Sequence, residues 1–123
     1  YLKKMNKKIR IIAVQPDGPF HGLEGLKHLE SSIVPEIYKS HFPDETIFVK
    51  TENAHARVRE LARHEGLLAG ISSGAALHAA IQIARREKPS ACIVTVFPDG
   101  ADKYLSERFW EESASPPETK EKA

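Results

Sequence analysis

The chain has 123 residues, of which 41% are hydrophobic and 28% charged, and its formal net charge is +1. This composition is that of one ordinary globular domain or part of one. The near-neutral charge gives no reason to expect a nucleic acid or an anionic membrane as partner, and no apolar run approaches the roughly 18 residues of a membrane span. The single cysteine, Cys92, excludes an internal disulfide framework, and we expect a cytoplasmic protein.

Four stretches are predicted to be strands because they are short, apolar and bounded by turn-forming residues. They are residues 9–14, 46–49, 67–69 and 91–97, and the last is the strongest because it reads Ala-Cys-Ile-Val-Thr-Val-Phe. Cys92 lies in the middle of that stretch, so we expect a buried, unreactive thiol. Residues 20–44 have no clear periodicity and are typical of a functional loop region.

Two helices are predicted between these strands. The first follows Thr51, which we expect to cap it, and Gly66 is well placed to end it. The second covers residues 73–88, and its spacing predicts a buried face and a solvated face. The buried face would hold Leu77, Ala80, Ile81 and Ala84, and the solvated face His78, Gln82 and Arg85.

Strands that alternate with helices predict an α/β fold, namely a doubly wound, mostly parallel sheet of about four strands with helices on both faces. We expect this fold to cover residues 1–112 and residues 113–123 to form a disordered polar tail. The carboxyl ends of parallel strands meet at one edge of the sheet, where ligands bind. Residues 15–16, 70–74 and 98–100 would gather at that edge.

Gly70-Ile-Ser-Ser-Gly74 satisfies the G-x-S-x-G pattern, in which a serine on a sharp turn acts as a nucleophile. A serine hydrolase that uses Ser72 needs an acid and then a histidine later in the chain, but His78 is the only histidine after Ser72. The alternative to a catalytic serine is a purely structural role, in which glycine and serine form a tight turn and Ser72 or Ser73 caps the helix. A glycine-rich phosphate loop and the H-E-x-x-H metal motif are both missing from the sequence, so we expect no metal.

Three segments resemble a known family. Glu65-Gly-Leu-Leu-Ala-Gly-Ile-Ser-Ser-Gly-Ala-Ala76 resembles the E-G-[IL]-x-x-G-[IV]-S-S-G-[AG]-A signature of the cysteine synthase and cystathionine β-synthase family, which are fold type II pyridoxal-phosphate enzymes. The segment from Phe97 to Ser106 resembles the P-D-x-G-D-[RK]-Y-L-S stretch near the end of that family. The segment from Pro19 to Gly25 matches its H-x-I-x-G substrate loop more loosely. The residues after Gly25 favour the B-type cysteine synthase branch.

The resemblance implies a cofactor site built by four residues of this chain. Ser72 would hydrogen-bond the pyridine nitrogen of pyridoxal 5'-phosphate, Pro98 and Asp99 would line the edge of its ring, and Gly25 would bring a backbone close to the substrate. The family's Schiff-base lysine and phosphate loop belong to its amino-terminal half, and Lys50 and Lys103 do not match that lysine motif. The resemblance therefore implies the carboxyl-terminal part of a longer enzyme, with no catalytic residue in this chain and no activity on its own.

The reaction implied is a β-replacement that forms L-cysteine. An activated serine, either O-acetylserine or O-phosphoserine, would give an aminoacrylate to which sulfide or another thiol adds, in an enzyme that is a homodimer. Two alternatives from other classes stay open. They are a non-catalytic binding or interaction module of the same fold, and the serine hydrolase that uses Ser72.

Overall fold

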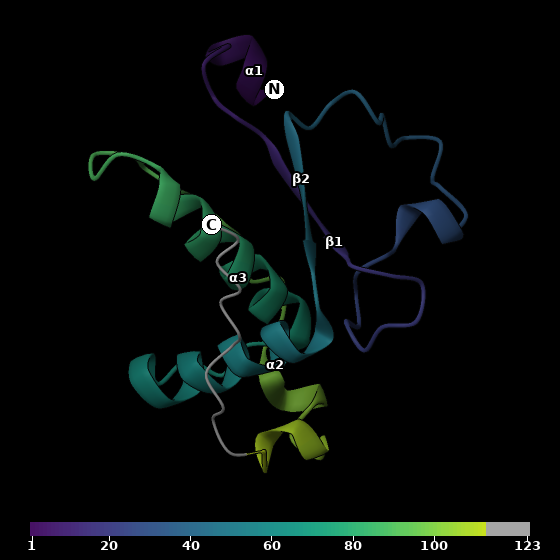
Figure 1. Cartoon of the computed structure of the whole chain (residues 1–123), viewed down its shortest axis with the longest axis vertical. Coiled ribbons are helices and arrows are strands. Elements are labelled where there is room, and N and C mark those ends of the chain that lie inside the picture. The colour runs from purple at the N-terminus through teal and green to yellow at the C-terminus, as the bar shows by residue number, and fades with distance from the viewer. Residues whose placement is uncertain (113–123) are drawn as a thin grey trace, which may run out of the picture.

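The computed structural model describes residues 1–112, so the predicted tail at 113–123 lies outside the described residues. A short α-helix precedes two strands, and two longer α-helices follow them, with shorter helical turns between and after these elements (Figure 1). The elements in order are α1 (Leu2–Met5), β1 (Ile12–Pro16), η1 (Leu29–Ser31), β2 (Glu45–Val49), α2 (Thr51–Glu60), η2 (Leu61–Glu65), α3 (Ile71–Arg86), η3 (Ala101–Lys103) and η4 (Arg108–Trp110).

The two strands pair in parallel, with Ile12 opposite Glu45 and Pro16 opposite Val49. The α3 helix lies on one side of the pair and the irregular connection of residues 17–44 on the other (Figure 1). The predicted α/β class with a parallel sheet is confirmed. The expected number of strands is wrong for the described residues, because the sheet has two strands instead of about four and no long helix covers its second face.

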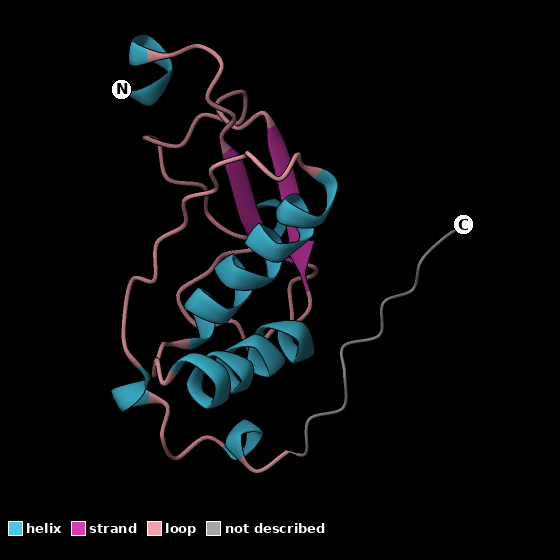
Figure 2. Ribbon diagram, turned by 90° about the vertical axis from the view of Figure 1, so that its left-hand side faces the viewer, coloured by secondary structure: helices cyan, strands magenta, loops and turns pink. Residues whose placement is uncertain are grey.

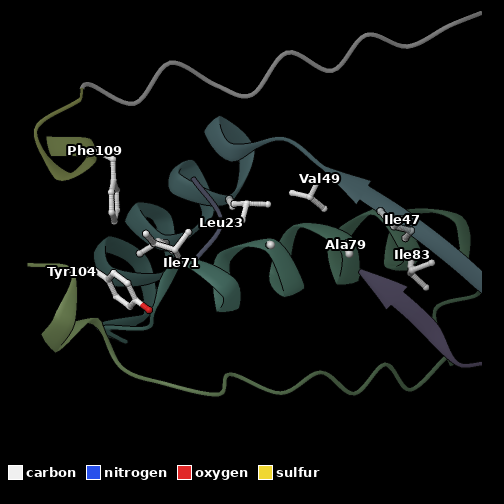
Figure 3. Packing of buried hydrophobic residues seen from close by; sticks show 11 residues of the cluster. Leu23, Ile47, Val49, Ile71, Ala79, Ile83, Tyr104 and Phe109 are labelled. Atoms are coloured by element: carbon white, nitrogen blue, oxygen red, sulfur yellow. The ribbon is translucent and has the colours of Figure 1, made fainter. Parts of the chain in front are cut away.

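The two missing strands are residues 67–69 and 91–97. Residues 91–97 run extended beside α3 without pairing to either strand (Figure 3), and their side chains are exposed, Val94 by 84% and Val96 by 72%. Cys92 is exposed as well, so the prediction of a buried thiol is wrong. An apolar run forms a strand only where another backbone supplies the ladder of hydrogen bonds. Within residues 1–112 the only such contact is one antiparallel bridge from Ala69 to Gly100.

The α2 and α3 helices cross and pack closely against each other (Figure 2). Their contact is close because Gly74 has no side chain: a Cβ there would lie 2.6 Å from Val58 Cγ2 and would also meet the Ala54 carbonyl oxygen. The helical turns that begin with α2 end at Gly66, which takes the left-handed φ of 67° and confirms its predicted role. Thr51 does not cap α2, since the cap position is Lys50 and no side chain bonds there.

The core is formed where α3 meets α2, β2 and the segments on either side of them (Figure 3). Its fully buried members include Leu23, Val49, Val58 and Ala75. The buried face of α3 differs from the predicted one: Ile71, Ala75, Ala79 and Ile83 point into the core, whereas Leu77, Ala80 and Ile81 are partly exposed and Ala84 is exposed. His78, predicted to be solvated, is only 7% exposed.

Ion pairs link the start of β1 and β2 to the carboxyl-terminal end of α3. Arg10, just before β1, bonds Glu45 of β2 at 2.8 Å and Glu87 after α3 at 2.5 Å. Arg86 pairs with the same Glu45. These charges join the start of both strands to the end of α3.

Candidate functional site

The amino-terminal end of α3 carries the serines that the sequence singles out. Gly70 occupies the cap position with φ −74° and ψ 172°, and no side chain caps the helix. The interpretation of Ser72 or Ser73 as the cap is therefore wrong. Both serines lie inside the first turn, where Ser72 is 8% exposed and Ser73 is completely buried. The first turn of this 16-residue helix has no acidic residue of its own, and the carboxylate that lies at its positive end is that of Asp99.

Gly25 lies directly against Ser72. A Cβ placed on Gly25 would be 3.6 Å from both Cβ and Oγ of Ser72. The loop around Gly25 is fixed from two sides, because the Gly22 N–H donates to Thr51 Oγ1 at 2.9 Å and Leu23 is fully buried. Gly25 has a φ of 88°, and the Leu26 N–H closes its turn by donating to the Leu23 carbonyl at 3.1 Å. A left-handed turn at a glycine therefore brings bare backbone to the serine hydroxyl.

Asp99 reaches the same helix end from the opposite direction. The Gly70 N–H donates to the Asp99 carbonyl at 3.1 Å, and the Ala101 N–H donates to the Leu68 carbonyl at 3.1 Å. The Tyr104 hydroxyl donates to Asp99 Oδ2 at 3.0 Å. Asp99 Oδ1 is buried and has no hydrogen-bond partner among residues 1–112. Pro98, the neighbouring site candidate, is exposed.

Three of the four predicted site residues, Gly25, Ser72 and Asp99, thus lie at one helix end. Gly25 lies beside Ser72. Asp99 is hydrogen-bonded to Gly70, which precedes Ser72 by two residues. Pro98 is the sequence neighbour of Asp99. The arrangement offers a buried neutral hydroxyl, an unpartnered carboxylate oxygen and the space that the missing side chain of Gly25 leaves beside Ser72. Such a set is suited to a polar ligand that carries both hydrogen-bond donors and acceptors.

Tyr104 lies within the segment from Phe97 to Ser106 but is not among the residues predicted to form the site. Its side chain is 7% exposed, and the hydrogen bond to Asp99 raises the pKa of its hydroxyl, an effect to which burial adds. The hydroxyl therefore stays protonated as a donor. Tyr104 follows Asp99 by five residues, but the sequence does not predict the turn that brings the two side chains together.

His78 does not supply the base that a serine hydrolase needs. Its Nε2 is engaged with Gln82 Nε2 at 3.1 Å, and its Nδ1 is buried with no partner within residues 1–112. Burial lowers the pKa of the His78 imidazole, and the positive charges of Arg57 and Arg85 lower it further. The structure records no hydrogen bond between His78 and Ser72 in the part of the chain that it describes.

Neither a metal cluster nor a membrane span is found in the described part of the chain. Residues 1–112 bring together no group of three histidine, cysteine, aspartate or glutamate side chains suited to a metal ion. None of the helices described there has the length and apolar character needed to cross a membrane.

Comparison with known proteins decides the family. A family model described as pyridoxal-phosphate dependent enzyme matches residues 1–99. The chain belongs to this family. A cysteine synthase of Aquifex aeolicus is 55% identical over 108 residues, which are 85% of this chain and 33% of that protein. An O-acetylserine dependent cystathionine beta-synthase of Bacillus subtilis is 42% identical over 117 residues, 90% of this chain and 38% of that protein.

A solved member of the family has the same fold. The crystal structure of a cysteine synthase from Entamoeba histolytica superposes with a TM-score of 0.83 at 32% identity, covering 94% of this chain and 36% of that one. The predicted resemblance to the cysteine synthase and cystathionine β-synthase family is thus confirmed, and the B-type branch stays a prediction. The chain spans about a third of the length of the curated relatives that it matches.

The residues at the start of α3 fit one side of the family's cofactor. Pyridoxal phosphate has a flat aromatic ring with a nitrogen at its edge, and its substituents include a hydroxyl group. Ser72 offers a hydroxyl that can donate or accept, and the unpartnered Asp99 Oδ1 can accept. The backbone at Gly25 leaves room beside Ser72 that a side chain would fill.

Proposed function

We propose that the intact protein is a pyridoxal-phosphate dependent β-replacing enzyme of the cysteine synthase kind. It would form L-cysteine from an activated serine, O-acetylserine or O-phosphoserine, and sulfide or another thiol. The printed names of the relatives support this reaction, since they are cysteine synthases and an O-acetylserine dependent cystathionine beta-synthase. Family membership supports the cofactor.

Ser72 would hold the pyridine nitrogen of the cofactor, which when bound supplies an electron sink for the substrate's α-carbon. The Ser72 hydroxyl is neutral, so it does not favour a protonated pyridine ring as an aspartate would. A weaker sink suits the expulsion of a group from Cβ. Burial of Ser72 at 8% exposure limits competition from water for that hydrogen bond.

Gly25, Pro98 and Asp99 complete the proposed contacts. Gly25 would carry its backbone to the substrate, and Pro98 and Asp99 would line the edge of the ring. The contact of Gly25 with Ser72, at 3.6 Å from a virtual Cβ to Oγ, is the observation that carries the proposal. It brings together at one point of the fold two motifs that lie far apart in the sequence.

The remaining properties are proposed on the resemblance to the family alone. We infer a homodimer that works in the cytoplasm, with an amino-acid substrate and a sulfur donor as its small-molecule partners. A gel-filtration mass of the intact protein tests the dimer, and a mass of one subunit would contradict it.

The experiment for this function is Ser72→Asp in the intact protein. A carboxylate at the pyridine nitrogen favours ring protonation, so the visible absorbance of the holoenzyme should shift and cysteine formation should slow by about 100-fold. Ser106→Asp, in an exposed position, is the matched control and should leave both unchanged. If Ser72→Asp leaves both the spectrum and the rate at the parent values, the assigned role is wrong.

A further inference from the structure

The buried Tyr104 and the partly buried Asp99 form a pair in which one carboxylate oxygen of Asp99 has no hydrogen bond within residues 1–112. The Tyr104 hydroxyl donates to Oδ2 at 3.0 Å, while Oδ1 is buried with no partner within residues 1–112. A buried carboxylate oxygen without a hydrogen bond costs free energy, because it has lost its water. The positive end of α3 offsets part of this cost, but the oxygen still has no donor, and a donor group of a ligand would supply one.

The position of the carboxylate depends on Gly70. A Cβ at Gly70 would meet Asp99 Oδ1 and would lie 2.8 Å from Asp99 Cγ and 2.9 Å from Tyr104 Cε2. The carboxylate and the tyrosine ring therefore occupy the space that the missing side chain leaves at the cap of α3. Asp99 Oδ1 therefore lies beside Gly70, the cap residue of α3, which precedes Ser72 by two residues.

Tyr104 acts on the side chain of Asp99, whereas other groups hold its backbone. The Asp99 carbonyl accepts from the Gly70 N–H, and the flanking Ala101 N–H bonds the Leu68 carbonyl. These two bonds fix the segment without fixing the carboxylate. The one hydrogen bond to the carboxylate within residues 1–112 comes from Tyr104, whose carbonyl is in turn held by Trp110 Nε1 at 2.7 Å.

We propose that Tyr104 is a positioning residue that holds Asp99 Oδ1 ready for a donor group of the ligand bound at the start of α3. A carboxylate oxygen only accepts, so the ligand group is an N–H or an O–H. The inference rests on the proposed function for the identity of the ligand as pyridoxal phosphate with its amino-acid substrate. Tyr104 itself touches Asp99 and the core, where its ring lies in the same cluster as Ile71 (Figure 3).

The test is Tyr104→Phe in the intact protein freed of cofactor. The ring and its packing stay, and only the hydroxyl that orients Asp99 is lost. Titration with pyridoxal 5'-phosphate, followed by quenching of protein fluorescence, should show a dissociation constant raised about tenfold, the usual effect of one hydrogen bond to a charged group. Tyr1→Phe is the matched control, since Tyr1 is 83% exposed, and should bind as the parent does.

A double-mutant cycle separates positioning from packing. Asp99→Asn should weaken binding about tenfold as well, and the double variant should be no weaker than the weaker single variant, because both remove the same contact. Independent, additive losses would overturn the proposal. So would a Tyr104→Phe dissociation constant within about twofold of the parent's.

Two further variants keep the outcome clear. If Tyr104→Phe does not fold, Asp99→Asn alone decides, since it leaves the buried ring untouched, and unchanged binding would overturn the proposal. Ser72→Ala separates the two levels of inference. Weakened binding in Ser72→Ala together with parent-like binding in Tyr104→Phe rejects the role of Tyr104 only. Parent-like binding in Ser72→Ala rejects the role of Ser72, and a parent protein that does not bind pyridoxal 5'-phosphate rejects the proposed function.

Discussion

At the scale of single residues, the site depends on side chains that are absent as much as on those that are present. Gly70 has φ −74° and ψ 172°, a backbone conformation that any residue adopts. Its requirement for glycine is one of space alone, because Asp99 and Tyr104 fill the volume of its Cβ. Gly25 is different, since its φ of 88° belongs to the left-handed region that favours glycine.

Gly70→Ala should therefore act by steric displacement. The added methyl group pushes the Asp99 carboxylate away from its bond with Tyr104, so we expect a loss of about 1–3 kcal/mol in the free energy of unfolding together with weakened cofactor binding. Gly18→Ala is the matched control, because a Cβ at Gly18 has nothing within 4 Å. Thermal unfolding and cofactor titration of the intact protein check this, and a Gly70→Ala protein as stable as the parent would contradict it.

At the scale of elements, a set of contacts between α2 and the segment after η3 forms a clasp. Its residues are His55, Arg59, Phe109 and Glu112. The His55 ring stacks on Phe109 with centroids 4.3 Å apart, and Arg59 Nη1 donates to the Phe109 carbonyl at 2.7 Å. Arg59 also pairs with Glu112 at 3.2 Å. Since Tyr104 lies just before this clasp, the contacts of α2 hold the chain that carries Tyr104 to the site.

The clasp should loosen in mild acid. Burial lowers the pKa of His55 below its usual 6.5; Arg59 lowers it too, whereas Glu112, Glu52 and Glu107 oppose the shift. Below pH 6.5 the unfolded chain therefore binds a proton that the folded chain refuses, so the stability that is present above this pH is lost as pH falls. His78, whose pKa burial also lowers, contributes in the same direction.

His55→Phe isolates the part that His55 contributes. Phenylalanine keeps the stack on Phe109 and cannot bind a proton, so the fall in unfolding midpoint between about pH 8 and about pH 5.5 should be smaller than in the parent. Exposed carboxylates such as Asp44, whose pKa is lowered from 3.8 by the Ile11 N–H and then by Lys3, act in a more acidic range. An equal fall in both proteins would contradict the role of His55.

At the scale of the whole molecule, the sequence predicts local turns better than the pairing of strands. Gly66 ends its helical turns as predicted, and the segments that hold Gly25, Ser72 and Asp99 lie at one helix end, where their role stays a prediction. The prediction of strands at 67–69 and 91–97 is wrong, because an apolar pattern shows that a segment suits burial and does not show which backbone pairs with it. The apolar residues Val94 and Val96 stay exposed in the absence of such a strand.

The face of α3 was undecidable from its sequence for a related reason. The helix carries two apolar stripes, one through Ile71, Ala75, Ala79 and Ile83 and one through Leu77, Ala80, Ile81 and Ala84. A helix that is apolar on two sides does not specify by periodicity which side packs first. The glycine at 74 decides it here, because it lets α2 approach the first stripe closely.

We propose that the amino-terminal end of α3 binds the pyridine ring of pyridoxal phosphate through Ser72. This is tested by the dissociation constant of pyridoxal 5'-phosphate for the cofactor-free intact protein and its Ser72→Ala variant, with Ser106→Ala as the exposed control. We expect a dissociation constant raised about tenfold in Ser72→Ala and unchanged in Ser106→Ala. Equal constants in all three proteins would contradict it.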